Sequence, residues 1–141
     1  DPVSRRQIWD FIYAMQGRGI TLFVTTHYME EAERCNRIGF IDRGRLVALG
    51  TPAHLKQTRM GAQVVSLTGP DLYGIYSALK GTDLVLDINL YGNDLHAVVD
   101  DAAGALPRIE AHLRRSGMAL TEGRAIPPSI EDVFVRLTRR A

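Results

Sequence analysis

The sequence predicts an α/β fold in its first part and an α+β sandwich in its second. The run Ile20–Thr26 is β-branched and aromatic with little alternation, which is typical of a strand covered on both faces in a parallel sheet. From Gln63 onward, strand-like and helix-like segments follow in the order strand, helix, strand, strand, helix, strand. The chain has 141 residues, 45% apolar and 23% charged. This composition is typical of one or two globular domains and excludes a disordered or fibrous chain.

The first 60 residues predict alternating helices and strands. A helix is expected over Val3–Met15, where Ile8, Phe11, Ile12 and Met15 repeat at helical spacing and should form one buried face. After the strand Ile20–Thr26, a second helix is expected from Tyr28 to about Arg34. The remaining elements are a hairpin of Arg37–Asp42 and Arg45–Leu49 around Arg43-Gly44, and a helix opened by Thr51 and Pro52.

A composition shift near Gly61 predicts a domain boundary, which divides the chain into residues 1–60 and 61–141. The second part should contain four strands, Gln63–Thr68, Leu84–Tyr91, Leu95–Val99 and Met118–Ile126. In the second of these strands, Leu84, Leu86, Ile88 and Leu90 should point one way. Helices are expected over Asp71–Leu79 and around Leu106, Ile109 and Leu113, the latter ended by Gly117. This order predicts a ferredoxin-like split βαβ sandwich.

A final helix should begin at Ser129. Ser129 and Asp132 have the spacing of a capping box, in which each side chain accepts a hydrogen bond from the other residue's backbone. Ile130, Val133, Phe134 and Leu137 would form the apolar stripe of this helix. The helix should therefore pack against another element.

Charge and cysteine content exclude several classes of function. The formal net charge of +1 gives no field that would draw nucleic acid or anionic lipid to the chain. The single cysteine, Cys35, excludes a disulfide scaffold and a thiolate zinc site, so a reducing compartment fits best. No apolar run approaches the roughly 20 residues needed to span a bilayer. Any membrane would therefore be reached through a partner.

His27 is the residue most indicative of function. It follows the predicted strand Ile20–Thr26 directly, and ligands of open α/β sheets bind at the carboxyl ends of the strands. The alternative is a histidine at a strand end that only bonds a backbone carbonyl.

Three ordered segments resemble the ATP-binding subunit of an ABC transporter. They are Asp1-Pro-Val-Ser-Arg-Arg-Gln-Ile-Trp-Asp10, Thr26-His-Tyr-Met-Glu-Glu-Ala-Glu33 and Ile41-Asp-Arg-Gly-Arg-Leu-Val-Ala-Leu-Gly-Thr-Pro52. The resemblance covers residues 1 to about 58. It makes Asp1 similar to the D-loop aspartate at the interface of two nucleotide-binding domains, and His27 similar to the switch histidine that contacts the γ-phosphate and the attacking water. The segment Pro128-Ser-Ile-Glu-Asp-Val-Phe134 is similar to the end of drug-efflux and ABC-2 type exporter subunits.

This resemblance implies that the chain is a C-terminal piece of a P-loop NTPase (ABC) domain followed by a ferredoxin-like accessory domain. The parent would be an ATPase that uses ATP and Mg²⁺, pairs as a homodimer and drives export through a transmembrane permease. It would lie in the cytoplasm at the inner face of the cell membrane. The phosphate-binding G-x-x-x-x-G-K-[ST] loop, the L-S-G-G-Q signature, the Q-loop and the Walker B carboxylates are absent. The fragment alone is therefore expected to bind no cofactor and to be inactive.

Two other functions stay open. Residues 61–141 could be a regulatory or dimerising module, since split βαβ sandwiches often bind ligands or pair through their sheets, although the fold alone does not establish it. The parent could instead be an ABC ATPase that works without a membrane partner. The first part should also lack the neighbouring strand for Ile20–Thr26, so it is expected to exchange with a second copy, pair at its edge or be poorly ordered.

Several other residues receive structural interpretations. Asp1 could equally be a plain helix N-cap. Glu30, Glu31 and Glu33 are interpreted as a solvated helix face rather than a metal site, and Cys35 as a small buried apolar residue. Arg114-Arg115 and Arg139-Arg140 are interpreted as solvated helix ends. No role is assigned to His54, His96 or His112.

Overall fold

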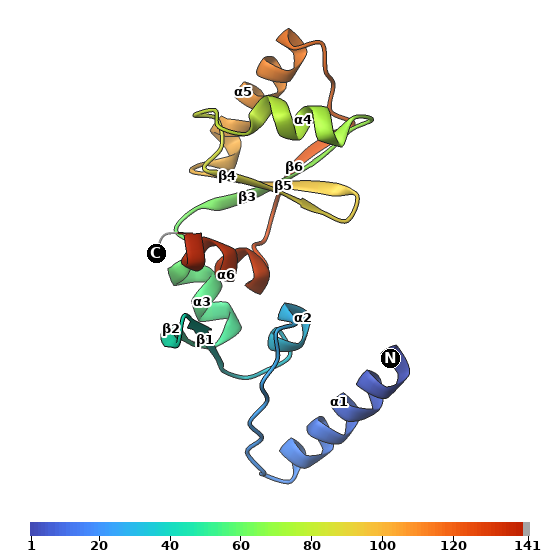
Figure 1. Ribbon diagram of the computed structural model, residues 1–141, viewed down its shortest axis with the longest axis vertical. Coiled ribbons are helices and arrows are strands. Elements are labelled where there is room, and N and C mark those ends of the chain that lie inside the picture. Colours follow the sequence, from blue (N-terminus) through green and yellow to red (C-terminus); the bar gives the residue numbers. More distant parts are fainter. Residues whose placement is uncertain (140–141) are drawn as a thin grey trace.

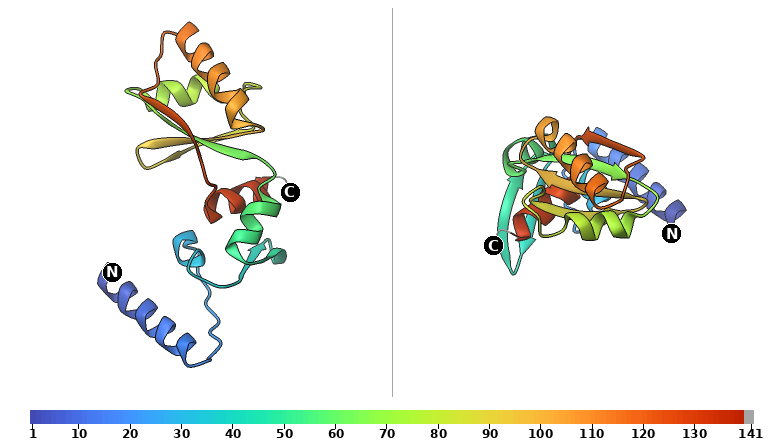
Figure 2. Two further views of the ribbon diagram at one scale, coloured as in Figure 1. Left: turned by 180° about the vertical axis from the view of Figure 1, so that it is seen from behind. Right: turned by 90° about the horizontal axis from the view of Figure 1, so that it is seen from above.

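The computed structural model describes residues 1–139, which form six helices and two antiparallel sheets. Figure 1 shows an elongated molecule in which helix α1 stands apart at one end and a four-stranded sheet lies toward the other. Helices α4 and α5 cover one face of this sheet, and α6 and α3 lie against the other (Figures 1 and 2). None of the helices in residues 1–139 has the length and apolar character needed to cross a bilayer.

Helix α1 (Pro2–Gly17) presents most of its apolar side chains to solvent. Its predicted buried face is wrong in this structure, because Ile8 is 57% exposed and Phe11 is 59% exposed. The buried residue is Trp9, whose ring lies beneath the guanidinium of Arg34 at 5.6 Å. Helix α1 therefore contacts the rest of the chain through Trp9 and through the polar side chains of Arg5 and Gln16, while most of its apolar side chains remain uncovered.

The strand predicted over Ile20–Thr26 is also absent from the structure. These residues belong to no helix or strand, and the Phe23 side chain is 96% exposed. A lone extended segment has no neighbour to accept its backbone hydrogen bonds, and the described part of the chain provides no strand beside it. The prediction of a strand over Ile20–Thr26 is therefore wrong in this structure, because a strand needs a partner strand beside it.

A compact unit follows, made of a short helix, a hairpin and a further helix. Helix α2 (Met29–Ala32) has only one turn, and it is shorter than the predicted Tyr28–Arg34. Strands β1 (Ile38–Asp42) and β2 (Arg45–Gly50) pair antiparallel around Arg43 and Gly44, which both have positive φ. That conformation matches a two-residue hairpin turn, as predicted. Helix α3 (Pro52–Arg59) is capped by Thr51, whose Oγ1 accepts from the His54 N–H at 3.1 Å.

The four-stranded sheet has the strand order β4-β5-β3-β6 and is antiparallel throughout. Strands β3 (Gln63–Thr68) and β5 (Asp94–Val99) are central, while β4 (Asp87–Tyr91) and β6 (Glu122–Ile126) form the edges. Helices α4 (Leu72–Leu79) and α5 (Ala102–Arg115) connect them. The predicted order of the six elements is confirmed, although β4 and β6 begin three and four residues later than expected.

Each face of the sheet buries its own apolar cluster, because side chains alternate between the two faces along a strand. On the α4–α5 face the cluster includes Val65, Leu67, Ile75, Ile109 and Leu113. On the opposite face it includes Val64, Val98, Leu55, Ile130 and Val133. The second cluster also contains Ala32 and Phe40, so it joins the sheet to the N-terminal unit through helix α6.

The predicted single face of Leu84, Leu86, Ile88 and Leu90 is correct only in part. Leu84 and Ile88 pack into the α4–α5 cluster, whereas Leu86 is 45% exposed and Leu90 is 61% exposed. Leu84 and Leu86 precede strand β4, which begins at Asp87, so these two leucines do not follow the alternation of the strand.

Helix α6 (Ile130–Arg139) is the element that joins the two parts of the chain. The predicted capping box is confirmed: the Ser129 N–H donates to Asp132 Oδ2 at 2.8 Å, and the Asp132 N–H donates to Ser129 Oγ at 3.1 Å. The interpretation of Arg139 as a solvated helix end is correct in part: its side chain is 55% exposed at the end of α6, and its guanidinium also donates to Asp87 and to Asn89 Oδ1. Arg140 lies outside the described residues.

Candidate functional site

His27 lies in an exposed loop between the extended segment 20–26 and helix α2. Its ring is exposed to solvent and lies against the Tyr28 ring, with the two centroids 4.2 Å apart. The Arg5 guanidinium of α1 lies over the same tyrosine ring at 4.4 Å. His27 is therefore accessible to a ligand and has an aromatic and a cationic side chain beside it. We call residues 26–28 the His27 loop.

Hydrogen bonds to Thr26 fix the shape of the His27 loop. The Thr26 hydroxyl donates to Glu31 Oε2 at 2.5 Å and accepts from the Tyr28 N–H at 3.0 Å. Glu31 Oε1 also lies 4.0 Å from Arg5 Nε. A Thr hydroxyl that bonds the backbone two residues on forms a local turn, so the sequence Thr-His-Tyr folds over the start of α2.

Asp1 caps helix α1 in this structure. Its carboxylate accepts from the Val3 N–H at 3.2 Å and from the Ser4 hydroxyl at 2.9 Å. None of the hydrogen bonds or ion pairs found within residues 1–139 joins Asp1 to His27. The alternative structural role of Asp1 is therefore present, and the proposed contact with a second nucleotide-binding domain remains a prediction.

The acidic residues of α2 are not a uniformly solvated face, and that interpretation is wrong for two of the three. Glu30 is exposed, but Glu31 and Glu33 are only part-exposed and both have partners. Glu33 Oε2 accepts from Lys56 Nζ at 2.8 Å, and Glu33 Oε1 accepts from the Ile130 N–H at 2.8 Å. Within residues 1–139, no three His, Cys, Asp or Glu side chains gather into a possible metal site.

Cys35 lies directly after this region, is half-buried and packs against the apolar cluster that contains Ala32, so its interpretation as a small buried apolar residue is correct in part. Its thiol lies 3.6 Å from the Glu31 carbonyl oxygen. Partial burial raises the pKa of the Cys35 thiol, and the negative charge of Glu31 raises it further. Cys35 is therefore a poor nucleophile at neutral pH.

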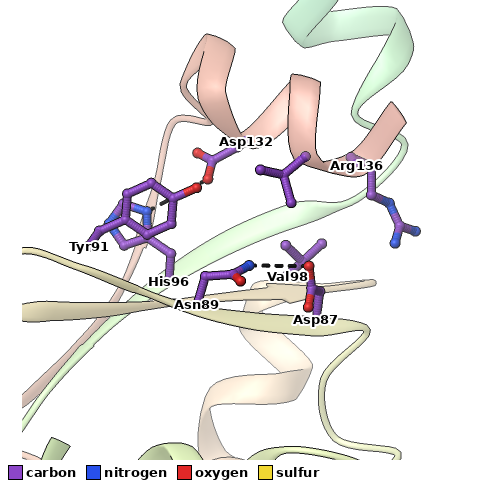
Figure 3. A pocket seen from close by; sticks show the side chains of 8 residues that line it. Asp87, Asn89, Tyr91, His96, Val98, Asp132 and Arg136 are labelled. Atoms are coloured by element: carbon purple, nitrogen blue, oxygen red, sulfur yellow. Dashed lines mark hydrogen bonds and ion pairs between the residues drawn. The ribbon is translucent and has the colours of Figure 1, made fainter. Parts of the chain in front are cut away.

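A second polar cluster lies between α6 and the sheet, and sequence reasoning missed it. Figure 3 shows Tyr91 and His96 from the sheet pointing toward Asp132 of α6. The Tyr91 and His96 rings are stacked with centroids 4.4 Å apart, and His96 Nδ1 lies 3.8 Å from Asp132 Oδ1. Burial, the negative charges of Asp132 and Glu131, and a hydrogen bond with Asp132 raise the pKa of Tyr91 above its usual range.

The remaining histidines have ordinary structural surroundings. His112 Nε2 lies 2.9 Å from the Ala78 carbonyl oxygen, a contact that joins α5 to α4. His54 is exposed on α3. A groove of about 420 Å³ opens between the end of α4 and strand β4, lined in part by Tyr76, Lys80 and Leu86. Neither histidine lines this groove.

Comparison with known proteins identifies the relatives of this chain. It is 36% identical to the "Nod factor export ATP-binding protein I" of Rhizobium sp. (strain N33), over an alignment of 142 residues. It is also 36% identical to the protein of that name in Paraburkholderia xenovorans (strain LB400), and 34% identical to the one in Mesorhizobium japonicum (strain LMG 29417 / CECT 9101 / MAFF 303099). The chain is a relative of the C-terminal part of ABC ATPases. The resemblance stated from the motifs is thus confirmed.

The match covers nearly all of this chain but only part of each relative. Each alignment covers 99% of this chain but only 44%, 44% and 39% of the respective relative. The chain thus spans less than half the length of the ABC proteins that it matches. No family model matches the sequence.

Proposed function

We propose that this chain is the C-terminal portion of an exporter ATPase and that His27 is its switch histidine. The observation that carries the proposal is the similarity to ATP-binding relatives over 99% of the chain, His27 included. The solvent-exposed imidazole of His27 supports it, because a ring sealed in an apolar interior could not reach a nucleotide.

The imidazole of His27 has the chemistry that this role requires. Catalysis of phosphoryl transfer depends mainly on positioning and on stabilising negative charge. A neutral imidazole donates one hydrogen bond and accepts another, so His27 can bond a γ-phosphate oxygen with one nitrogen and orient a water with the other. The Thr26 and Glu31 contacts would hold the ring at that position.

ATP and Mg²⁺ would be held mainly by parts of the parent ATPase that this chain does not include. The chain has no glycine-rich phosphate loop with its lysine, and residues 1–139 contain no acidic cluster suited to a metal. Of the groups that contact nucleotide, the chain would contribute His27, and Asp1 would lie at the interface of two ATPase subunits. We therefore expect the isolated 141 residues to hydrolyse no ATP.

The partners of the parent follow from the same proposal. A second ATPase subunit would complete the nucleotide sites, and a transmembrane permease would carry the exported substrate. The parent would then work at the cytoplasmic face of the membrane. The word "export" in the names of the relatives supports this function over an ABC ATPase without a membrane partner.

Residues 61–141 are proposed to form a ferredoxin-like accessory domain behind the ATPase part, residues 1–60. The strand order β4-β5-β3-β6, with α4 and α5 on one face, supports that assignment. A regulatory or dimerising role is the second candidate function, and the open sheet, whose outer strands are β4 and β6, supports it. Light scattering that shows only monomer at high concentration would contradict dimerisation through this domain.

The decisive experiment replaces His27 in the longer ATP-binding protein of which we propose this chain to be a part. His27→Ala should lower kcat for ATP hydrolysis about 100-fold or more, a loss typical of removing a hydrogen-bond donor that stabilises the transition state, while nucleotide binding changes little. His54→Ala is the matched control, since His54 is also exposed but lies on α3. Equal activity of the two variants would refute the role of His27.

Micromolar binding of Mg-ATP by the isolated chain in calorimetry would refute the expected inactivity of the fragment.

A further inference from the structure

Glu33 connects the His27 loop to helix α6 across a large separation in sequence. It lies at the end of α2, and both oxygens of its carboxylate are engaged by partners outside that helix. One accepts from the backbone N–H of Ile130 at 2.8 Å and the other from Lys56 Nζ at 2.8 Å. Glu33 and Ile130 are 97 residues apart, so this contact joins the two parts of the chain.

The contact with Ile130 has a clear physical basis. The first N–H groups of a helix have no partner within the helix, and the helix dipole favours a negative charge at that end. The capping box of Ser129 and Asp132 provides acceptors for the backbone N–H groups of these two residues. It provides none for the backbone N–H of Ile130. Ile130 is fully buried, so water cannot replace Glu33 easily.

The other end of α2 holds the candidate switch histidine. His27 and Glu33 are separated only by the cap residue Tyr28 and the four residues of α2. A single helical turn is not stable alone, so its position depends on contacts at its ends and on the burial of Ala32. The Thr26–Glu31 bond fixes the N-terminal end, and Glu33 fixes the C-terminal end.

Helix α6 is in turn fixed to the sheet. Asp132 lies beside Tyr91 and His96, and Arg139 donates to Asp87 and Asn89 (Figure 3 shows the Asp132 cluster). A continuous series of contacts thus runs from the His27 loop through α2, Glu33 and α6 to strands β4 and β5. Such contacts can carry an energetic coupling between two sites.

We infer that Glu33 is a positioning residue through which α6 and its sheet set the position of the His27 loop. The functional meaning of this coupling rests on the proposed role of His27. The coupling is reciprocal, so a displacement of the His27 loop is transmitted to α6, and a displacement of α6 is transmitted to His27.

The test uses amide hydrogen exchange on the 141-residue chain, without nucleotide. Glu33→Gln keeps the size of the side chain but removes its charge, so exchange should accelerate about tenfold for residues 28–32 as well as for 130–133. The NMR signals of the His27 ring should shift in the same variant. Glu30→Gln is the matched control, because it removes the same charge from an exposed position of α2, and it should change exchange less than about twofold.

One pattern would overturn the inference. If Glu33→Gln accelerates exchange at residues 130–133 but leaves residues 28–32 and the His27 signals unchanged, Glu33 is only a cap of α6.

Lys56→Met provides a second variant should Glu33→Gln fail to fold. It removes the contact of Glu33 Oε2 alone and should accelerate exchange at residues 28–32. No change there would also count against the coupling. Because no nucleotide is present, these outcomes do not depend on whether His27 acts in ATP hydrolysis.

Discussion

Asp132 shows how a buried charge is accommodated in this protein. Its side chain is 4% exposed, yet it accepts from the backbone and hydroxyl of Ser129 and lies beside Tyr91 and His96. A buried carboxylate is tolerated when hydrogen bonds replace its lost hydration. The same charge acts on Tyr91, because a phenolate would be repelled by Asp132 and Glu131. Tyr91 is therefore held in its neutral form.

This environment predicts a specific loss of stability at high pH. The pKa of Tyr91 is raised in the folded state above its ordinary value of about 10, so the unfolded chain loses the proton first. The contribution of Tyr91 to stability is thus fully present below about pH 10 and decreases as the pH rises toward the higher folded-state pKa. Tyr91→Phe should reduce the fall in unfolding free energy between pH 9 and 11, measured by urea denaturation.

The control for this prediction is Tyr73→Phe, which changes a tyrosine that is 79% exposed. That variant should keep the wild-type dependence on pH. If both variants lose stability with pH as steeply as the unmodified chain, the buried environment does not retain the proton on Tyr91.

The residue scale also shows what the sequence can and cannot predict. The Ser129–Asp132 box was predictable because its two members lie three residues apart and the pattern is local. The contacts of Glu33 with Ile130 and of Arg139 with Asp87 join residues 97 and 52 apart. Only the tertiary fold brings these partners together. From the sequence alone, Glu33 and Arg139 could therefore only be interpreted as solvated charges on helices.

At the scale of the elements, we expect α6 to depend on its N-terminal cap more than α3 does. Helix α6 joins α2, α3 and the sheet, whereas α3 contacts α6 and the hairpin. Ser129→Ala removes the acceptor for the Asp132 N–H and a donor to its carboxylate. We expect it to lower the free energy of unfolding by about 1–2 kcal/mol, and Thr51→Ala on α3 by about 1 kcal/mol or less. Urea denaturation of both variants measures the difference, and a larger effect at Thr51 would contradict this order.

The extended segment 20–26 and helix α1 predict self-association. Phe23, Phe11 and Ile8 are 96%, 59% and 57% exposed, which is unusual for a stable surface. No side chain of residues 1–139 covers them, so two copies should associate through these side chains. Phe23→Ser should lower the apparent mass of concentrated samples in light scattering, whereas Tyr73→Ser, a change at an exposed side chain of α4, should leave it unchanged. Equal masses for wild type and Phe23→Ser would contradict this association.

Across the whole molecule, the sequence predicted the positions of helices and strands more reliably than the contacts that these elements make. The six elements from β3 to β6 were predictable because each has its own local pattern and because their partners lie within residues 63–126. The segment 20–26 has an equally strong strand pattern, yet it forms no strand here. The difference is the presence of neighbours, since hydrogen-bonded ladders and buried faces stabilise a strand more than residue preference does.

This contrast predicts a steep gradient of local stability along the molecule. Amides of 64–67 lie in a central strand that is paired on both sides and buried, so they should exchange only on global unfolding. Amides of 22–24 have no ladder partner and should exchange at nearly the rate of an unstructured peptide. Hydrogen exchange followed by NMR on a sample shown by light scattering to be monomeric would measure both sets. Equal protection of 22–24 and 64–67 in that monomer would contradict the gradient, because it would require a strand partner for 20–26 within the single chain. If protection at 22–24 instead appears only as the protein concentration rises, the partner is a second copy.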